Sequence, residues 1–91
     1  YARLAAEAIA PDHPAHGYFE RHYRQARDHT CQSFKAMAAR GELRAGVDPE
    51  YAALAFIALM DGLQVQWLTT PHLDLVGTLR FYLQQLVTVP L

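Results

Sequence analysis

The sequence feature that most constrains the fold is a run of nine consecutive apolar residues, AALAFIALM, at positions 52–60. At about 3.6 residues per turn, nine residues cover roughly two and a half helical turns, so every side of a helix here is apolar. A helix that is apolar all round has to be covered all round. The remaining chain offers only about three further helices. We therefore expect a second chain to cover part of this helix, although packing within one chain alone is the simpler alternative.

The boundaries of this helix are marked by local signals. Asp48 is suited to an N-cap, Pro49 to the first helical position and Glu50 to the first turn. The helix is expected to run to about Leu68 and to end before Pro71.

Other segments also show helical periodicity. The chain is expected to begin with a helix over residues 1–10, which the sequence PDHP then breaks. A long helix follows over residues 15–40, with Gly41 ending it. Its apolar stripe recurs at steps of three and four: Phe19, Tyr23, Ala26, Thr30, Phe34 and Met37.

A last amphipathic helix is expected from the N-cap Asp74 to about residue 87, before Pro90. No segment shows the alternation typical of strands. The sequence therefore predicts a single all-α domain over residues 1–91, folded as an antiparallel helical bundle.

Small residues indicate where a partner packs. Ala55, Leu59, Gly62 and Gln66 share one helical face, and Ala58 lies one turn from Gly62. A glycine inside a helix costs roughly 1 kcal/mol relative to alanine, and close approach of another helix is a plausible compensation. We expect the last two helices of each of two chains to form a four-helix bundle across a two-fold axis. The last helix contributes four residues to this interface: Leu79, Tyr82, Leu83 and Leu86.

Composition argues against several classes of function. With 8 basic and 9 acidic residues, the chain has a net charge of −1, which does not indicate a surface that binds nucleic acid. No run reaches the roughly 18 apolar residues of a membrane span. The single cysteine, Cys31, fits a reducing compartment and has no histidine one turn away to activate it. His16 and Glu20 are one turn apart, but no third ligand has metal-site spacing, so we expect no metal, no cofactor and no enzyme.

Several aromatic and sulfur-containing side chains are candidates for an apolar effector pocket between helices. They are Phe19, Tyr23, Phe34, Met37, Phe56, Met60 and Trp67. The alternative for each of them is a place in a filled core.

Asp61 interrupts the apolar helix next to Gly62. It lies on a different face from Gly62, and we expect it to be buried. A buried carboxylate has to be paired or hydrogen-bonded. It could hold a histidine or arginine of the long helix, or mark the polar corner of an effector pocket. We favour the first, structural role.

Five segments in this order resemble the C-terminal domain of TetR-type (tetracycline repressor-like) transcriptional regulators. They are DHPAH followed by RHYR, then GELRAGVDPE, ALMDGLQVQWL and DLVGTLRFYL. The resemblance covers about residues 10–86. It implies a bacterial cytoplasmic regulator, whose N-terminal helix-turn-helix domain is not contained in this chain. It also implies homodimerisation through helices at about 49–68 and 74–87, and a small-molecule effector that releases operator DNA from a repressor.

Two other functions remain open at this stage. One is a stand-alone helical module for dimerisation or protein interaction. The other is a small helical enzyme, for which the sequence provides no acid–base or nucleophile pair.

Overall fold

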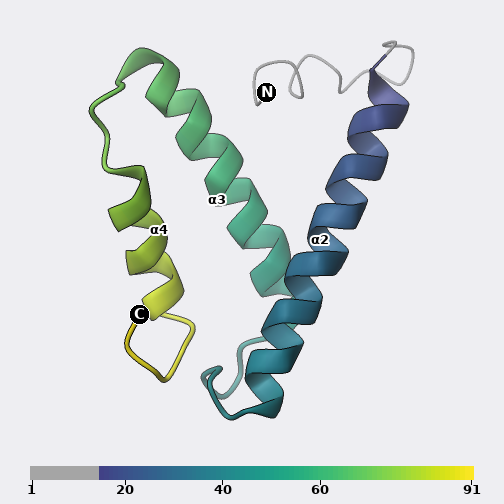
Figure 1. Ribbon diagram of the computed structural model, residues 1–91, viewed down its shortest axis with the longest axis vertical. Helices are drawn as coiled ribbons and strands as arrows, with labels where there is room; N and C mark the ends of the chain where they lie inside the picture. The colour runs from purple at the N-terminus through teal and green to yellow at the C-terminus, as the bar shows by residue number, and fades with distance from the viewer. Residues whose placement is uncertain (1–14) are drawn as a thin grey trace.

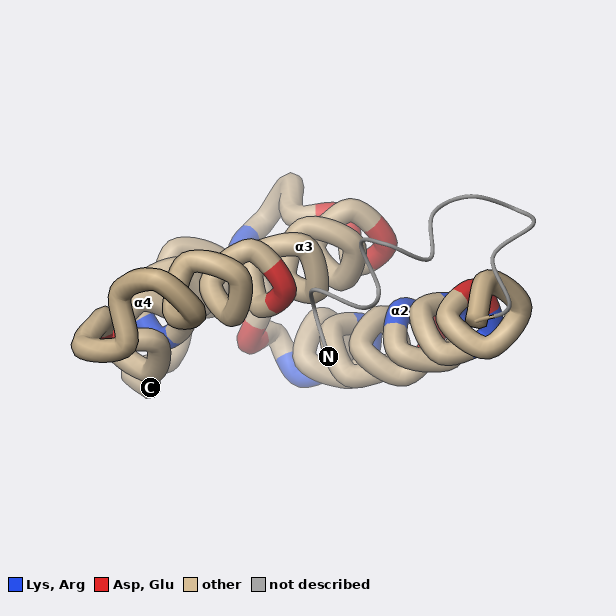
Figure 2. Tube along the Cα trace, turned by 90° about the horizontal axis from the view of Figure 1, so that it is seen from above, with Lys and Arg blue, Asp and Glu red and all other residues tan. Residues whose placement is uncertain are grey.

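The computed structural model describes residues 15–91, and these form three helices. They are α2 (His16–Ala39), α3 (Pro49–Thr69) and α4 (Leu75–Gln84). Helices α2 and α3 form a V that closes where the C-terminal end of α2 meets the N-terminal end of α3, and α4 runs back alongside α3 (Figure 1). The predicted all-α class is confirmed, whereas the helix expected over residues 1–10 and its PDHP break lie outside the described residues. The molecule extends 43 × 31 × 15 Å, and the three described helices lie side by side in a single layer (Figures 1 and 2).

The long helix α2 buries the stripe that its sequence predicts. Phe19 and Phe34 are buried, and the other four members are partly buried: Tyr23, Ala26, Thr30 and Met37. Gly41 ends the helix in the left-handed region, at φ +74°. Its N–H donates to the Ala38 carbonyl at 3.0 Å and the Glu42 N–H donates to the Met37 carbonyl at 2.9 Å. This is the Schellman pattern of paired hydrogen bonds that satisfies the last carbonyls of a helix.

Both later helices begin at the expected caps. The Asp48 carboxylate accepts a hydrogen bond from the Glu50 N–H at 2.9 Å, at the start of α3. The Asp74 carboxylate accepts one from the Gly77 N–H at 2.9 Å, at the start of α4. Each bond satisfies an N–H that the first helical turn leaves without a partner.

The prediction that the last helix reaches residue 87 is wrong, since α4 ends at Gln84. The chain leaves the helix because residues 86–88 pair with the loop after α2. Leu43 and Val87 form an isolated antiparallel bridge. The Arg44 N–H donates to the Leu86 carbonyl at 2.8 Å, and the Thr88 N–H donates to the Glu42 carbonyl at 2.9 Å. We refer to this pairing of residues 41–44 with 86–88 as the clasp.

Side chains reinforce the clasp. The Thr88 hydroxyl donates to the Gly41 carbonyl at 3.0 Å. The Gln84 amide donates to the Val89 carbonyl at 2.9 Å and accepts from the Leu91 N–H at 3.0 Å. The residues after α4 are therefore held against the base of the V.

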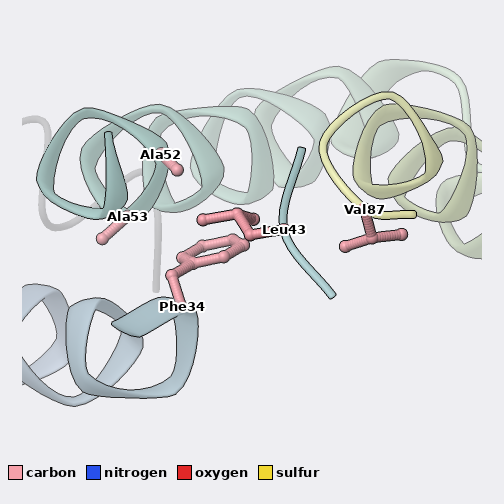
Figure 3. Close-up of a cluster of buried hydrophobic side chains, with 5 residues drawn as sticks. All are labelled: Phe34, Leu43, Ala52, Ala53 and Val87. Atoms are coloured by element: carbon pink, nitrogen blue, oxygen red, sulfur yellow. The ribbon is translucent and has the colours of Figure 1, made fainter. Parts of the chain in front are cut away.

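The main core lies at this base. Its buried members come from both helices, the loop and the C-terminal segment: Phe34, Leu43, Ala52, Ala53 and Val87. Leu43 lies between Phe34 and Val87 (Figure 3). Val87 is only 1% exposed and Phe34 only 4%. A second small cluster, formed by Phe19 with Ala15 and Tyr23, lies near the other end of α2.

Candidate functional site

The most conspicuous surface feature is an uncovered apolar stripe along α3. Tyr51 is 75% exposed and Leu54 is 52% exposed. The stripe continues at steps of three and four, and its exposed members are Tyr51, Leu54, Ala55, Ala58, Gly62 and Val65. None of these side chains carries a charge. Figure 2 shows that α3 and α4 are almost free of charged residues, whereas several lie along α2.

The structure places the predicted interface residues of α3 on or beside this stripe. Ala55, Ala58, Gly62 and Gln66 are exposed, and Leu59 is partly buried. No atom lies within 4 Å of where a Cβ on Gly62 would sit, so nothing in the chain itself requires a glycine there.

The predicted interface residues after α3 are less exposed. Leu79, Tyr82 and Leu83 are partly buried on α4, and Leu86 lies beyond its end. Tyr82 and Leu86 line a shallow groove of about 340 Å³ together with Tyr51 and Ala55 of α3. This groove borders the stripe, so α3 and α4 present a largely apolar surface, with Asp48 as the one charged residue lining the groove.

Among residues 15–91, the seven side chains predicted to line an effector pocket fall into separate groups. Three of them pack at the core: Phe34, Met37 and Phe56. The rings of Phe34 and Phe56 meet edge to face, with centroids 6.5 Å apart.

The other four lie elsewhere along the helices. Phe19 and Tyr23 form the second cluster on α2. Met60 is partly buried, and Trp67 is 44% exposed.

The expected burial of Asp61 is not found in the single chain. Asp61 is partly exposed, and within residues 15–91 no buried charged side chain is present. It lies one turn after Ala58 and one turn before Val65, at the edge of the apolar stripe, where it is partly exposed to water. A pairing partner is therefore not required for it.

Besides the shallow groove that borders the stripe, two further grooves in the described residues offer space for a small molecule. The larger, of about 500 Å³, lies where α2 crosses α3. Its walls carry charged, polar and apolar groups: Arg27, Asp28, Cys31, Gln32, Lys35, Glu50, Tyr51, Ala53 and Leu54. The smaller, of about 320 Å³, lies between α3 and α4 and is almost wholly apolar: Phe56, Val76, Leu79, Arg80, Leu83 and Leu91. Only Phe56 among the predicted pocket residues lines either groove.

Other polar groups do not assemble into a reactive site in the part that the structure describes. His16 and Glu20 are paired at 3.6 Å, and no three potential metal ligands come together within residues 15–91. Cys31 is a free, partly buried cysteine on the wall of the larger groove.

By length and composition, α3 could cross a membrane, although no run of 18 apolar residues occurs in it. The same property is common in helices that are buried inside soluble proteins. Little of α3 is buried by this chain, and Asp61, Gln64 and Gln66 interrupt its C-terminal half. The exposed apolar face of α3 therefore requires an apolar partner surface that leaves these polar side chains in contact with water or with hydrogen-bonding groups.

In the described residues, the helix order, the two aspartate caps and the glycine ending define an all-α domain. Residues 3–88 match the family model described as "BetI-type transcriptional repressor, C-terminal". The chain belongs to this family, and the resemblance to TetR-type regulators is confirmed. It is thus a domain of a transcriptional regulator, in a family of regulators rather than enzymes. No curated protein and no solved structure shows significant similarity to the chain.

Proposed function

We propose that this domain dimerises through the uncovered apolar surface of α3 and α4 and senses a small-molecule effector for a TetR-type repressor. The observation that carries the proposal is the stripe from Tyr51 to Val65, which is uncovered in residues 15–91, where the helices form a single layer. Stable domains bury their apolar faces between at least two packed layers. A second copy supplies the missing layer.

A second copy also explains the composition of the stripe. Exposed apolar patches of this kind mark sites of interaction. Ala58 and Gly62 leave room for a helix of the partner to approach closely, which accounts for a glycine that the single chain does not need. Two α3–α4 pairs then form a four-helix bundle. A soluble dimer leaves Asp61 at the edge of its interface, near water, which a lipid environment would not.

The regulatory step follows from the family. Operator DNA is bound by a helix-turn-helix domain outside this chain, and the regulator acts in the cytoplasm. An effector that binds one arrangement of the helices better than another shifts the population toward it. The spacing of the two DNA-binding heads then changes, and they no longer fit successive major grooves.

The dimer is tested by Gly62→Leu. Overpacking at a close helix contact costs about 1–3 kcal/mol. Because the two-fold axis places one substituted residue from each copy in the interface, this cost arises twice. The dissociation constant of the dimer should therefore rise roughly 30-fold to 10⁴-fold. Sedimentation equilibrium over a concentration series measures it. The matched control is Ala36→Leu, which adds an apolar side chain to the exposed surface of α2.

A dimer and a monomer predict opposite effects of Gly62→Leu on stability. In a monomer, the open space around Gly62 accepts the new side chain, and the better helix former stabilises α3. A monomeric parent protein, or a variant that dimerises as tightly as the parent, would rule out this interface.

A further inference from the structure

The smaller groove between α3 and α4 lies on the side of α3 away from the apolar stripe. One of its walls is Phe56, which precedes Ala58 of the stripe by two residues. At about 100° per residue, these two side chains point some 160° apart around the helix. A partner that covers the stripe of α3 therefore leaves the Phe56 wall of this groove open.

The lining of the groove has a simple chemistry. Five of its side chains are apolar, and Arg80 is the single charged one. Arg80 is exposed, and within residues 15–91 it forms no ion pair. Its position on α4, one turn after Val76 and one residue after Leu79, places a guanidinium at the rim of an apolar surface.

This combination favours an amphipathic anion. A guanidinium presents a fork of N–H donors that matches the two oxygens of a carboxylate. Ligand sites are typically apolar, with one or a few polar groups that fix the orientation of the ligand. An amine or a quaternary ammonium is disfavoured, because Arg80 would repel it and no acidic side chain lines the groove.

The volume limits the size of the apolar body. An apolar cavity of about 150 Å³ holds one benzene molecule. The groove, at about 320 Å³, has room for roughly twice that amount. A medium-length alkyl chain or a short arylalkyl chain is of this size.

We propose that the α3–α4 groove binds a free apolar monocarboxylate, with Arg80 holding the carboxylate and Phe56, Leu79 and Leu83 contacting its apolar body. This inference rests on the effector-sensing role proposed above and specifies the chemical class of the effector. Because both walls belong to the proposed dimer helices, a ligand seated there changes the packing of α4 on α3. Leu79 and Leu83 of this groove are also predicted interface residues, so the site adjoins the dimer interface and is placed to act on it.

The test is titration calorimetry of the purified protein with decanoate below its micelle concentration. Decanol and decyltrimethylammonium serve as the neutral and cationic probes of equal chain length. We expect saturable binding of one decanoate per chain, at least tenfold tighter than either other probe.

Variants assign the site. Arg80→Gln should weaken decanoate binding about tenfold and leave decanol binding unchanged, whereas Arg80→Lys should restore part of the affinity. Arg24→Gln removes an exposed cation from α2 and should have no effect. Val76→Asn places a polar group in the apolar wall at a position that is 64% exposed, so it should weaken binding without unfolding the protein.

Three results would overturn the inference. The first is equal binding of all three probes, and the second is unchanged decanoate affinity in Arg80→Gln. The third is binding to anionic lipid vesicles without binding of free decanoate, which would assign the surface to a membrane. If decanoate does not bind, but native mass spectrometry shows that the dimer retains a different metabolite, this inference is wrong and the effector-sensing proposal stands. A protein that retains no metabolite and binds no probe would count against both.

Discussion

Val87 is the residue whose truncation tests the base of the V most sharply. Its side chain is 1% exposed and packs in the cluster with Phe34, Leu43, Ala52 and Ala53. Val87→Ala removes two carbon atoms from this cluster. Burying each of these carbon atoms away from water contributes about 0.8 kcal/mol to stability, and the cavity that the substitution leaves adds to the loss. We expect a loss of about 2–3 kcal/mol in the free energy of unfolding.

That loss is large for a domain of this size. A chain of 91 residues has a typical stability of about 5–14 kcal/mol. For domains of roughly 60–100 residues, each kcal/mol shifts the melting temperature by about 4–8 °C. Thermal melts of Val87→Ala should therefore lie about 8–24 °C below the parent at equal protein concentration, since dimerisation makes the melt concentration-dependent.

The matched control is Val76→Ala, which makes the same change at a position that is 64% exposed. It should change the stability by less than about 0.5 kcal/mol. Hydrogen exchange adds a local measurement, because the amides of Arg44 and Thr88 are bonded across the clasp. Both should exchange faster in Val87→Ala. A variant that melts within about 2 °C of the parent would show that the C-terminal segment does not anchor the core.

Two further predictions concern the ends of the helices. Gly41→Ala places a side chain at φ +74° with no atom within 4 Å, so its cost of about 1–2 kcal/mol comes from the backbone alone. Urea unfolding should show this loss, with Gly41→Asn losing less; an equal loss in both would point to a different cause. Asp74→Ala removes the acceptor of the Gly77 N–H and should cost about 1 kcal/mol, most of which Asp74→Asn should retain. Circular dichroism melts measure both, and an unaltered Asp74→Ala would mean that the cap does not hold α4 in solution.

Local signals explain why much of the fold could be predicted from the sequence. The stripe of α2 needs only the period of an α-helix, and its residues from Phe19 to Met37 are buried or partly buried as expected. Asp48 and Asp74 act on N–H groups two or three residues away, and Gly41 acts on the turn before it. Each of these features is decided within a few residues of chain.

The clasp could not be predicted in this way. It pairs residues 41–44 with residues 86–88, which are more than 40 positions apart, and this pairing ends α4 three residues early. The apolar pattern of residues 75–86 continues through the break, so periodicity alone extends the helix. Leu86 belongs to that pattern yet lies outside the helix because its carbonyl accepts from Arg44.

The same distinction applies to the candidate sites: the surface on α3 could be predicted from the sequence, whereas the grooves between helices could not. The small residues of α3 mark a surface that belongs to one helix, so a helical wheel identifies it. Both grooves form between two helices, and no pattern within one helix shows which side chains meet there. The sequence shows that Arg80 is the one charged residue of α4. Its position in the same groove as Phe56 could not be predicted, because it depends on how α3 and α4 pack.

The central claim is that two copies of this chain meet along the stripe of α3. Cysteine cross-linking tests it most directly, in a Cys31→Ser background that removes the single native thiol. Packed helices lie about 8–10 Å apart, so a bifunctional maleimide of similar span should link Ala58→Cys to its copy in high yield. Gln25→Cys, on the exposed surface of α2, should remain monomeric on denaturing gels. Efficient linkage at position 25, or none at position 58, would contradict the account.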